Sequence, residues 1–246
     1  MHFTAQSTTD GIVERDFTLG DITGVLWSPE GGSGRAPLVL LGHGGGNHKK
    51  HPAMAGRARL LVLGGGFHVA CIDAPGHGDR PPFTKADERE IAEMLAAREA
   101  GRPEGPIVER FNGHLAERAV PEWQATLDAL QELPEIGPDG PVGYFGLNMG
   151  TAFGVRLAAI DRRITAAVFG LFWHGSLEEA ARRITIPVEF AMQWDDEHIP
   201  RESGLALFDA FASADKSLHV NSGKHKELPR FESDSAVRFF VRHLTV

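Results

Sequence analysis

Two segments of the chain carry carboxylates and an imidazole, the side chains that most often perform acid–base catalysis. Asp195-Asp196-Glu197-His198 follows an apolar run, and Gly223-Lys224-His225 follows the next apolar run along the chain. A carboxylate behind an imidazole fixes the tautomer of the histidine and raises its basicity. These residue types therefore indicate a general base that an acid orients.

A third segment, Gly146-Leu147-Asn148-Met149-Gly150, places an asparagine between two glycines. The glycines permit a tight turn from a strand into a helix, and asparagine tolerates unusual backbone angles. An amide donates and accepts hydrogen bonds, but it has no proton whose removal gives a good nucleophile at neutral pH. Asn148 therefore cannot make the acyl-enzyme that an esterase needs.

The elements that must position these segments alternate between strand and helix in the second half of the chain. This alternation predicts a mostly parallel sheet with helices on both faces, and working groups on loops at the carboxyl ends of its strands. The predicted strands are 12–19, 22–27, 37–41, 67–72, 142–145, 166–172, 187–192 and 217–220. The predicted helices are 52–63, 121–133, 149–160, 177–183, 201–211 and 228–244.

Residues 81–120 interrupt the alternation of strands and helices, and they are rich in charged residues and in residues that favour helices. The stretch is too long for a simple connection between two elements. Two interpretations stay open: a helical insertion that covers the site as a cap, or an extra helix in solvent. In either case we expect one domain over residues 1–246, because no linker or repeat divides the chain.

From about Pro37 onwards the chain resembles the α/β-hydrolase family, closest to its small esterase and dienelactone-hydrolase-like branch. The resemblance rests on the glycine-rich loop 42–48, on the Asp-x-Pro-Gly-His-Gly stretch 73–78, and on the elbow 146–150. The elbow matches the family's Gly-x-Ser-x-Gly except that Asn148 replaces the serine. The resemblance implies an α/β-hydrolase fold, with a mostly parallel central sheet, helices on both faces and a helical cap insertion.

The same resemblance assigns the catalytic positions. Asn148 takes the nucleophile's place, Asp196 is the acid with Asp195 as the second choice, and His225 is the base. The acid loop departs from the family pattern because Gln193 replaces the usual glycine.

Backbone N–H groups of the family's glycine loop and elbow bind the oxyanion of the reaction. By position we assign this role to Gly45, with Gly44 as the alternative, and to Met149. Three further loop residues are candidates for contact with the substrate: His48, Trp173 and His198.

Three functions are consistent with an asparagine at the elbow. In the first, the chain is a hydrolase of carboxylic esters, thioesters or lactones, either inactivated by Asn148 or a divergent member. In the second, His225 and Asp196 serve a lyase, decarboxylase, cyclase or isomerase, and Asn148 binds a substrate oxygen. In the third, the protein only binds a small molecule. The retained acid, base and glycine loop argue against the third function, and fold-level analogy places the hydrolase first.

The composition and the net charge of the chain limit the classes of partner that we expect. The 246 residues carry a net charge of −8, which disfavours nucleic acid and anionic membranes as partners. The single cysteine, Cys71, suits a cytoplasmic location, and the polar first ten residues predict no secretory signal. Histidine and carboxylate spacing gives no complete metal-ligand set, so we expect no metal or other cofactor. The oligomeric state cannot be predicted.

Overall fold

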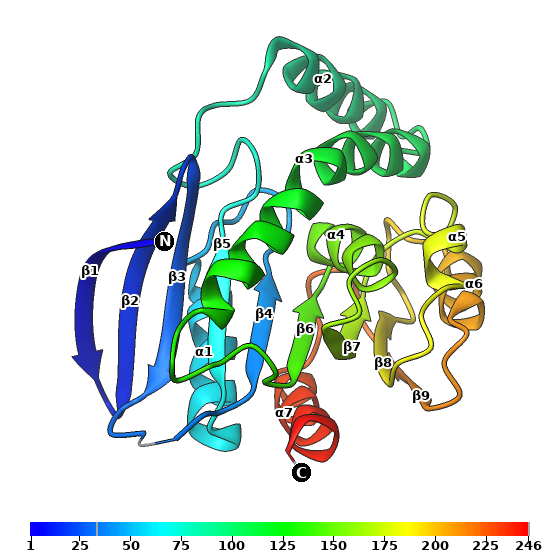
Figure 1. The fold of residues 1–246 in the computed structure, drawn as a ribbon. Helices are drawn as coiled ribbons and strands as arrows, with labels where there is room; N and C mark the ends of the chain where they lie inside the picture. Colours follow the sequence, from blue (N-terminus) through cyan, green and yellow to red (C-terminus); the bar gives the residue numbers. More distant parts are fainter. Residues whose placement is uncertain (33, 246) are drawn as a thin grey trace.

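Nine strands form one sheet in the computed structural model, which describes residues 1–32 and 34–245 (Figure 1). Their order across the sheet is β1-β2-β3-β5-β4-β6-β7-β8-β9. The pairs from β5 to β9 are parallel and the others antiparallel, which confirms the mostly parallel sheet. The strands are β1 (His2–Thr9), β2 (Ile12–Leu19), β3 (Ile22–Pro29), β4 (Leu38–Gly42), β5 (His68–Ile72), β6 (Val142–Gly146), β7 (Ile164–Gly170), β8 (Val188–Gln193) and β9 (Lys216–Asn221).

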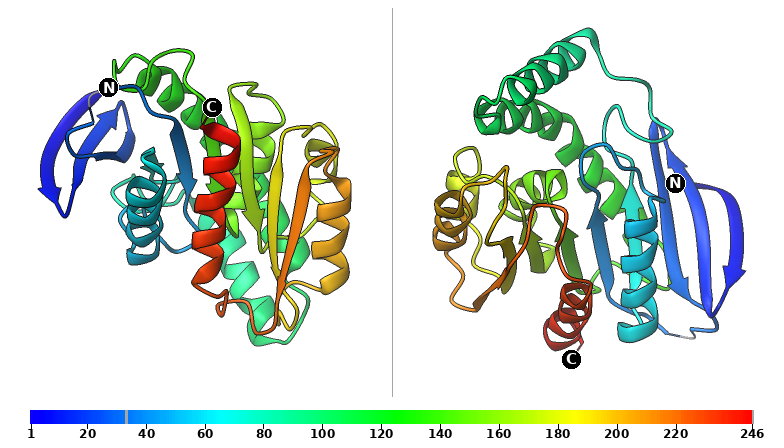
Figure 2. Two further views of the ribbon diagram at one scale, coloured as in Figure 1. Left: turned by 90° about the horizontal axis from the view of Figure 1, so that it is seen from below. Right: turned by 180° about the vertical axis from the view of Figure 1, so that it is seen from behind.

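Helices cover both faces of this sheet, as Figure 2 shows from two further sides. One face is covered by α1 (Pro52–Gly65) and α7 (Phe231–Leu244). The other face is covered by α3 (Gly105–Gln131), α4 (Met149–Ala158), α5 (Glu178–Ala181) and α6 (Arg201–Ala210). The predicted arrangement, a mostly parallel sheet with helices on both faces, is therefore confirmed.

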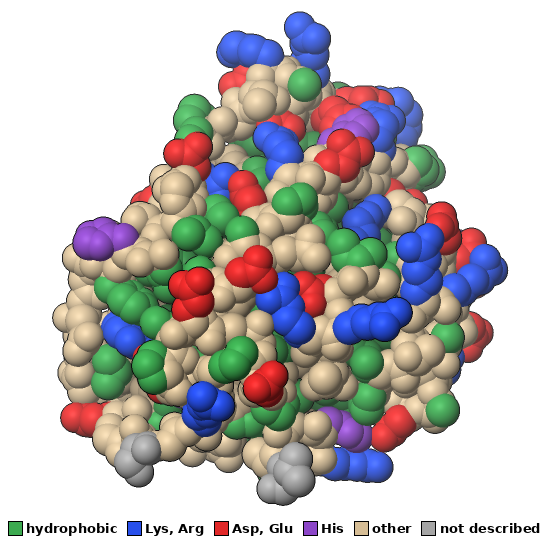
Figure 3. All heavy atoms as spheres, viewed as in Figure 1, with side chains coloured by type: hydrophobic (Ala, Val, Ile, Leu, Met, Phe, Trp, Pro, Cys, Tyr) green, Lys and Arg blue, Asp and Glu red, His purple; other side chains and the backbone are tan. Residues whose placement is uncertain are grey.

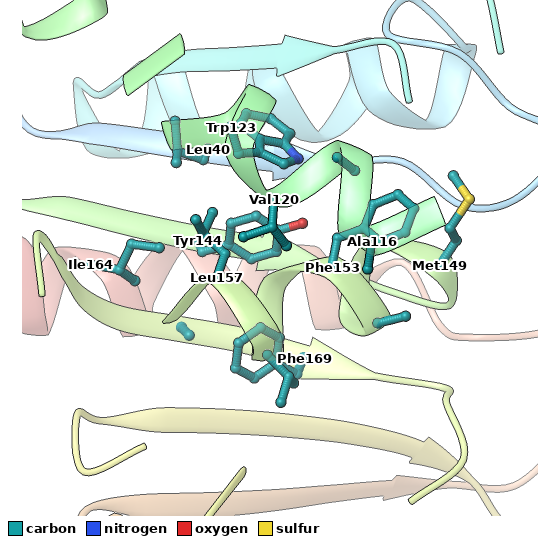
Figure 4. Packing of buried hydrophobic residues seen from close by; sticks show 14 of the residues in the cluster. Leu40, Ala116, Val120, Trp123, Tyr144, Met149, Phe153, Leu157, Ile164 and Phe169 are labelled. Carbon is teal, nitrogen blue, oxygen red and sulfur yellow. The ribbon is translucent and has the colours of Figure 1, made fainter. Parts of the chain in front are cut away.

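The alternation of side chains along the strands creates two cores. In β4, Leu38 and Leu40 join the core under α3 and α4, whereas Val39 and Leu41 join the core under α1 and α7. Successive strand residues point to opposite faces of a sheet, so a continuous apolar run serves both cores. Figure 4 shows the first core, where Trp123 of α3 packs near Tyr144 of β6.

The N-terminal strand β1 was not predicted. It pairs with β2 alone, at the edge of the sheet, and most of its side chains are exposed. Apart from Phe3, which packs against the core, and Ala5, the side chains of β1 are polar, so the strand has too little apolar alternation for sequence reasoning to detect. The turn into β2 uses Asp10 and Gly11, both with positive φ (50° and 79°), as tight hairpins require.

Two helices follow β5 (Figure 1). The first helix and the start of the second lie above the carboxyl ends of the strands, and the rest of the second helix runs down across one face of the sheet. The two helices are α2 (Lys85–Glu99) and α3, and the predicted helix start at Pro121 is wrong because this residue lies inside α3. Acidic, basic and histidine side chains meet over these helices, at the top of Figure 3. Arg110 of α3, for example, pairs with Glu90 and Glu93 of α2. Among the described helices, none combines the length and the apolar character that a bilayer crossing requires.

Candidate active site

The elbow between β6 and α4 holds Asn148 in a strained conformation, with φ 56° and ψ −123°. A non-glycine residue with positive φ costs about 1–3 kcal/mol and needs support from its surroundings. The flanking glycines provide the space: a Cβ on Gly150 would lie 2.5 Å from the carbonyl oxygen of Gly42 on β4. Asn148 also donates its backbone N–H to the Gly170 carbonyl at 3.1 Å. The glycines of the sequence Gly-x-Asn-x-Gly therefore allow the end of β4 and the start of α4 to pack closely together.

The predicted acid, Asp196, and the predicted base, His225, meet at the carboxyl ends of β8 and β9. Asp196 Oδ2 lies 2.7 Å from His225 Nδ1, and Asp196 Oδ1 accepts the backbone N–H groups of His198 and Ile199 at 2.9 Å each. Burial alone raises the pKa of Asp196, but the hydrogen bonds from His225, Ile199 and His198 outweigh it and hold the pKa below its ordinary value. Asp196 is therefore ionised at neutral pH, and its neighbour Asp195 is exposed and paired with Arg201.

Gln193, which departs from the family pattern, forms a hydrogen bond to the base loop, the segment 223–226 that carries His225. Its side chain is 1% exposed and donates a hydrogen bond from Nε2 to the carbonyl of Lys224 at 3.0 Å. The backbone N–H of His225 is held in turn by Glu197 Oε2 at 2.9 Å. The loop that carries His225 is thus fixed by two side chains from the acid loop.

The glycine-rich loop after β4 lies against the elbow. A Cβ on Gly44 would be 3.7 Å from the Cβ and Nδ2 atoms of Asn148, whereas Gly45 is exposed with nothing within 4 Å of such a Cβ. His43 fixes the loop: its Nε2 accepts the Ala74 N–H at 3.0 Å, so Nδ1 carries the proton and donates to the Gly44 carbonyl at 2.9 Å. Burial lowers the pKa of His43 to about 4, so the ring is neutral.

The elbow retains two unsatisfied polar groups. The backbone N–H of Met149, at the N-terminus of α4, has no partner within residues 1–32 and 34–245. Asn148 Oδ1 is buried, and it also has no partner there. Buried polar groups in folded proteins are normally paired, so these two are available to a bound molecule.

A cavity of about 1030 Å³ lies above the elbow. Residues 81–120 contribute much of its apolar wall, including Phe83, Ile91, Met94 and Phe111. The cavity joins eight of the nine predicted site residues, and Asp196 lies behind His225. The eight are Gly44, Gly45, His48, Asn148, Met149, Trp173, His198 and His225.

Comparison with solved structures gives a close relative over the whole chain. A cold-adapted esterase from an Arctic intertidal metagenomic library, solved as a PEG-bound complex, is 34% identical, with all of both chains covered and a TM-score of 0.78. The chain belongs to the α/β-hydrolase family. No family model matches the sequence, and no curated protein matches it either.

More distant α/β-hydrolases share the fold alone. An acetyl xylan esterase from Paenibacillus sp. R4 is 17% identical, with 99% of this chain and 88% of that chain covered and a TM-score of 0.72. A dienelactone hydrolase from Anabaena variabilis is 19% identical, with 96% and 100% covered and a TM-score of 0.63.

This α/β-hydrolase also places charged residues in the cavity that sequence reasoning missed: Arg57, Arg98, Glu104 and Lys226. Glu104, at the start of α3, is buried between Arg98 at 2.7 Å and His198 Nδ1 at 2.7 Å. The ring of His198 meets that of His225 edge-on, 5.2 Å between centroids. No pattern in the sequence joins residues 104 and 198, since only the fold brings the segment 81–120 onto the acid loop.

A second missed group lies on β8, β9 and α7. Potential metal-ligand atoms of Glu189, His219 and Glu232 lie within 4.8 Å of one another. The contacts among them already account for the group, since His219 Nδ1 is 2.7 Å from Glu232 Oε2, and Ser235 donates to Glu189 Oε2 at 3.0 Å. None of the three residues lines the cavity above the elbow.

Proposed function

We propose that this protein acts on a carboxylic ester, thioester or lactone, with His225 as base, Asp196 as its orienting acid and Asn148 at the nucleophile's position. The observation that carries the proposal is the 2.7 Å contact between Asp196 and His225 beside a cavity that Asn148 also lines. The whole-length relative at 34% identity is an esterase, which supports the same reaction class.

Asn148 removes the covalent step from this reaction. Because Nδ1 of His225 faces Asp196, Nε2 is the basic nitrogen. Nε2 takes a proton from water as the water oxygen bonds to the acyl carbon. The bond from the acyl carbon to the leaving oxygen or sulfur then breaks, and Nε2 returns the proton to the leaving group. Water, rather than a side chain, supplies the nucleophile.

Two kinds of backbone N–H stabilise the negative charge that develops on the carbonyl oxygen. Met149 offers the first, at the N-terminus of α4, where the helix dipole favours negative charge. The loop after β4 offers the second, from Gly44 or Gly45. Gly44 is the nearer of the two to Asn148, which favours it. His48, Trp173 and His198 line the same cavity and contact the rest of the substrate.

Exchange of Asn148 for serine tests the proposal. With a p-nitrophenyl ester, Asn148→Ser should release a burst of p-nitrophenol that matches the enzyme concentration, because the hydroxyl permits an acyl-enzyme. The unmodified chain should show slower release without a burst. His225→Ala should abolish both activities, and His114→Ala, at an exposed position on α3, should change neither. Absence of hydrolysis in the unmodified and serine forms would contradict the proposal.

A second candidate function follows from the unpaired Oδ1 atom of Asn148. In a lyase, decarboxylase, cyclase or isomerase, this amide would hold a substrate oxygen while His225 moves a proton. Exchange of a proton next to the carbonyl of a ketone or thioester in D₂O, followed by NMR, distinguishes this function. His225→Ala should stop the exchange, and Asn148→Ser should not improve it. A protein that only binds would show no exchange, and His225→Ala would leave its ligand affinity intact.

A further inference from the structure

Arg57 carries a charge that the protein leaves without a partner. It lies on α1, lines the cavity above the elbow, and stacks its guanidinium over the Phe145 ring at 5.3 Å. Within residues 1–32 and 34–245, no carboxylate lies within the 4.0 Å that defines an ion pair with it. Burial lowers the pKa of Arg57 to about 10, which leaves the group charged at neutral pH.

Other partly buried cations of this protein have hydrogen-bond partners, whereas Arg57 has none among the described residues. Arg156 and Lys216 donate to backbone carbonyls, and the others pair with carboxylates. Arg80 forms two hydrogen bonds to Glu122, at 2.9 and 2.6 Å, and Lys49 lies 2.6 Å from both Asp73 and Asp79. A charge that loses water without gaining a partner is costly, so folded proteins seldom keep one without a use. The exception at Arg57 therefore indicates a charge that a ligand neutralises.

The charge of the cavity wall has the opposite sign to that of the whole chain. Apart from histidines, the charged lining residues are Arg57, Arg98, Glu104 and Lys226. Arg98 and Glu104 neutralise each other, which leaves the positive charges of Arg57 and Lys226 in a chain whose net charge is −8. A cleft lined with one sign of charge concentrates ligands of the other sign.

Arg57 and part of the apolar wall come from opposite faces of the sheet. Arg57 belongs to α1, whereas Val108 and Phe111 belong to α3, which covers the other face. Lys226 follows His225 on the base loop and is exposed. A molecule that fills the cavity can therefore contact the apolar side chains of α3 and the guanidinium of Arg57 together.

We infer that Arg57, with Lys226 on the wall of the same cavity, forms an anion-binding subsite that takes a carboxylate of the substrate away from the group that reacts. The inference rests on the proposed function for the nature of the reacting group, and it narrows the substrate to an ester, thioester or lactone that carries a second, anionic carboxylate. The planar guanidinium can bind both carboxylate oxygens at once.

Binding, rather than turnover, tests the subsite. The probes are monobenzyl glutarate, which has a free carboxylate, and its neutral methyl ester, titrated into the unmodified protein by calorimetry. The half-ester should bind at least about tenfold more tightly, because a charge-assisted hydrogen bond contributes about 1.5–3 kcal/mol. Arg57→Gln should remove this preference and leave the affinity for the neutral diester unchanged.

Arg59→Gln is the matched control, since it removes the same charge from the same helix at an exposed position paired with Asp10. It should keep the preference for the half-ester. Arg57→Lys retains a positive charge without the planar guanidinium, and it should keep part of the preference for the half-ester. This variant replaces Arg57→Gln in the test if Arg57→Gln fails to fold. Retained preference in a folded Arg57→Gln, or an equal loss in Arg59→Gln, would overturn the inference. Failure of ester hydrolysis with this preference intact would overturn only the proposed function.

Discussion

The pair Asp196–His225 and the elbow at residues 146–150 differ in the hydrogen-bond partners of their polar groups. Asp196 has hydrogen-bond partners on both carboxylate oxygens, and His225 is held through both its backbone and its ring. At the elbow, Asn148 Oδ1 and the Met149 N–H lack partners within the described residues. The difference teaches that the protein fixes the imidazole of His225, its proposed base, in advance, whereas it leaves the polar groups around Asn148 free for a ligand.

Loss of the orienting acid should have the largest effect. In the Asn148→Ser background, Asp196→Asn should lower kcat for a p-nitrophenyl ester by about 10³–10⁴-fold, because an amide in place of the carboxylate favours the wrong tautomer of the base. Steady-state kinetics at neutral pH measure this loss. A decrease of less than tenfold would mean that the base does not depend on its fixed partner, and the contrast between the two regions would disappear.

The stability of the elbow should depend on the absence of a side chain at its glycines. Gly150→Ala places a Cβ 2.5 Å from the Gly42 oxygen and should lower the free energy of unfolding by about 1–3 kcal/mol. Gly56→Ala is the matched control, since that helical glycine has nothing within 4 Å of a Cβ, and it should stabilise α1 by about 0.5–1 kcal/mol. Urea denaturation compares the two. Equal effects would show that the elbow is not tightly packed.

Low pH should lower the free energy of unfolding through protonation of Asp196. Its pKa in the folded protein lies below the ordinary value of 3.8, so its stabilising effect is complete above pH 3.8 and is lost as the pH falls through the folded pKa. The free energy of unfolding, measured by urea at pH 7 and near pH 3, should therefore fall more in the unmodified chain than in Asp196→Asn. An identical fall in both proteins would contradict the assigned hydrogen bonds.

The smallest effect should come from the neighbouring carboxylate. Asp195 is exposed and pairs with Arg201 rather than with His225, so Asp195→Asn in the Asn148→Ser background should change kcat by no more than about twofold. The same ester assay measures it. A loss as large as that for Asp196→Asn would transfer the acid's role to Asp195.

Local pattern predicted most of the elements correctly. The strand at Ile12–Leu19 and its turn into β3 were predicted with the bounds that β2 has, because their apolar spacing and the Gly20 turn are strong local signals. The final helix was predicted from residue 228, yet α7 starts at Phe231. The start at Pro121 failed for a different reason. Proline is typical of a first helical turn, but here it is exposed inside a long helix whose apolar face packs on the sheet.

The sequence by itself determined which chemistry this protein carries: an imidazole, carboxylates, a glycine loop and an amide on an elbow, because residue types and their positions after strands are local properties. The tertiary structure alone decided which partners they have. It brought His225 to Asp196 rather than to Asp195, brought Gly44 against Asn148, and left Arg57, which lines the same cavity, without an ion-pair partner among the described residues. Those choices depend on distances between segments far apart in the chain, and only packing of the whole sheet fixes such distances.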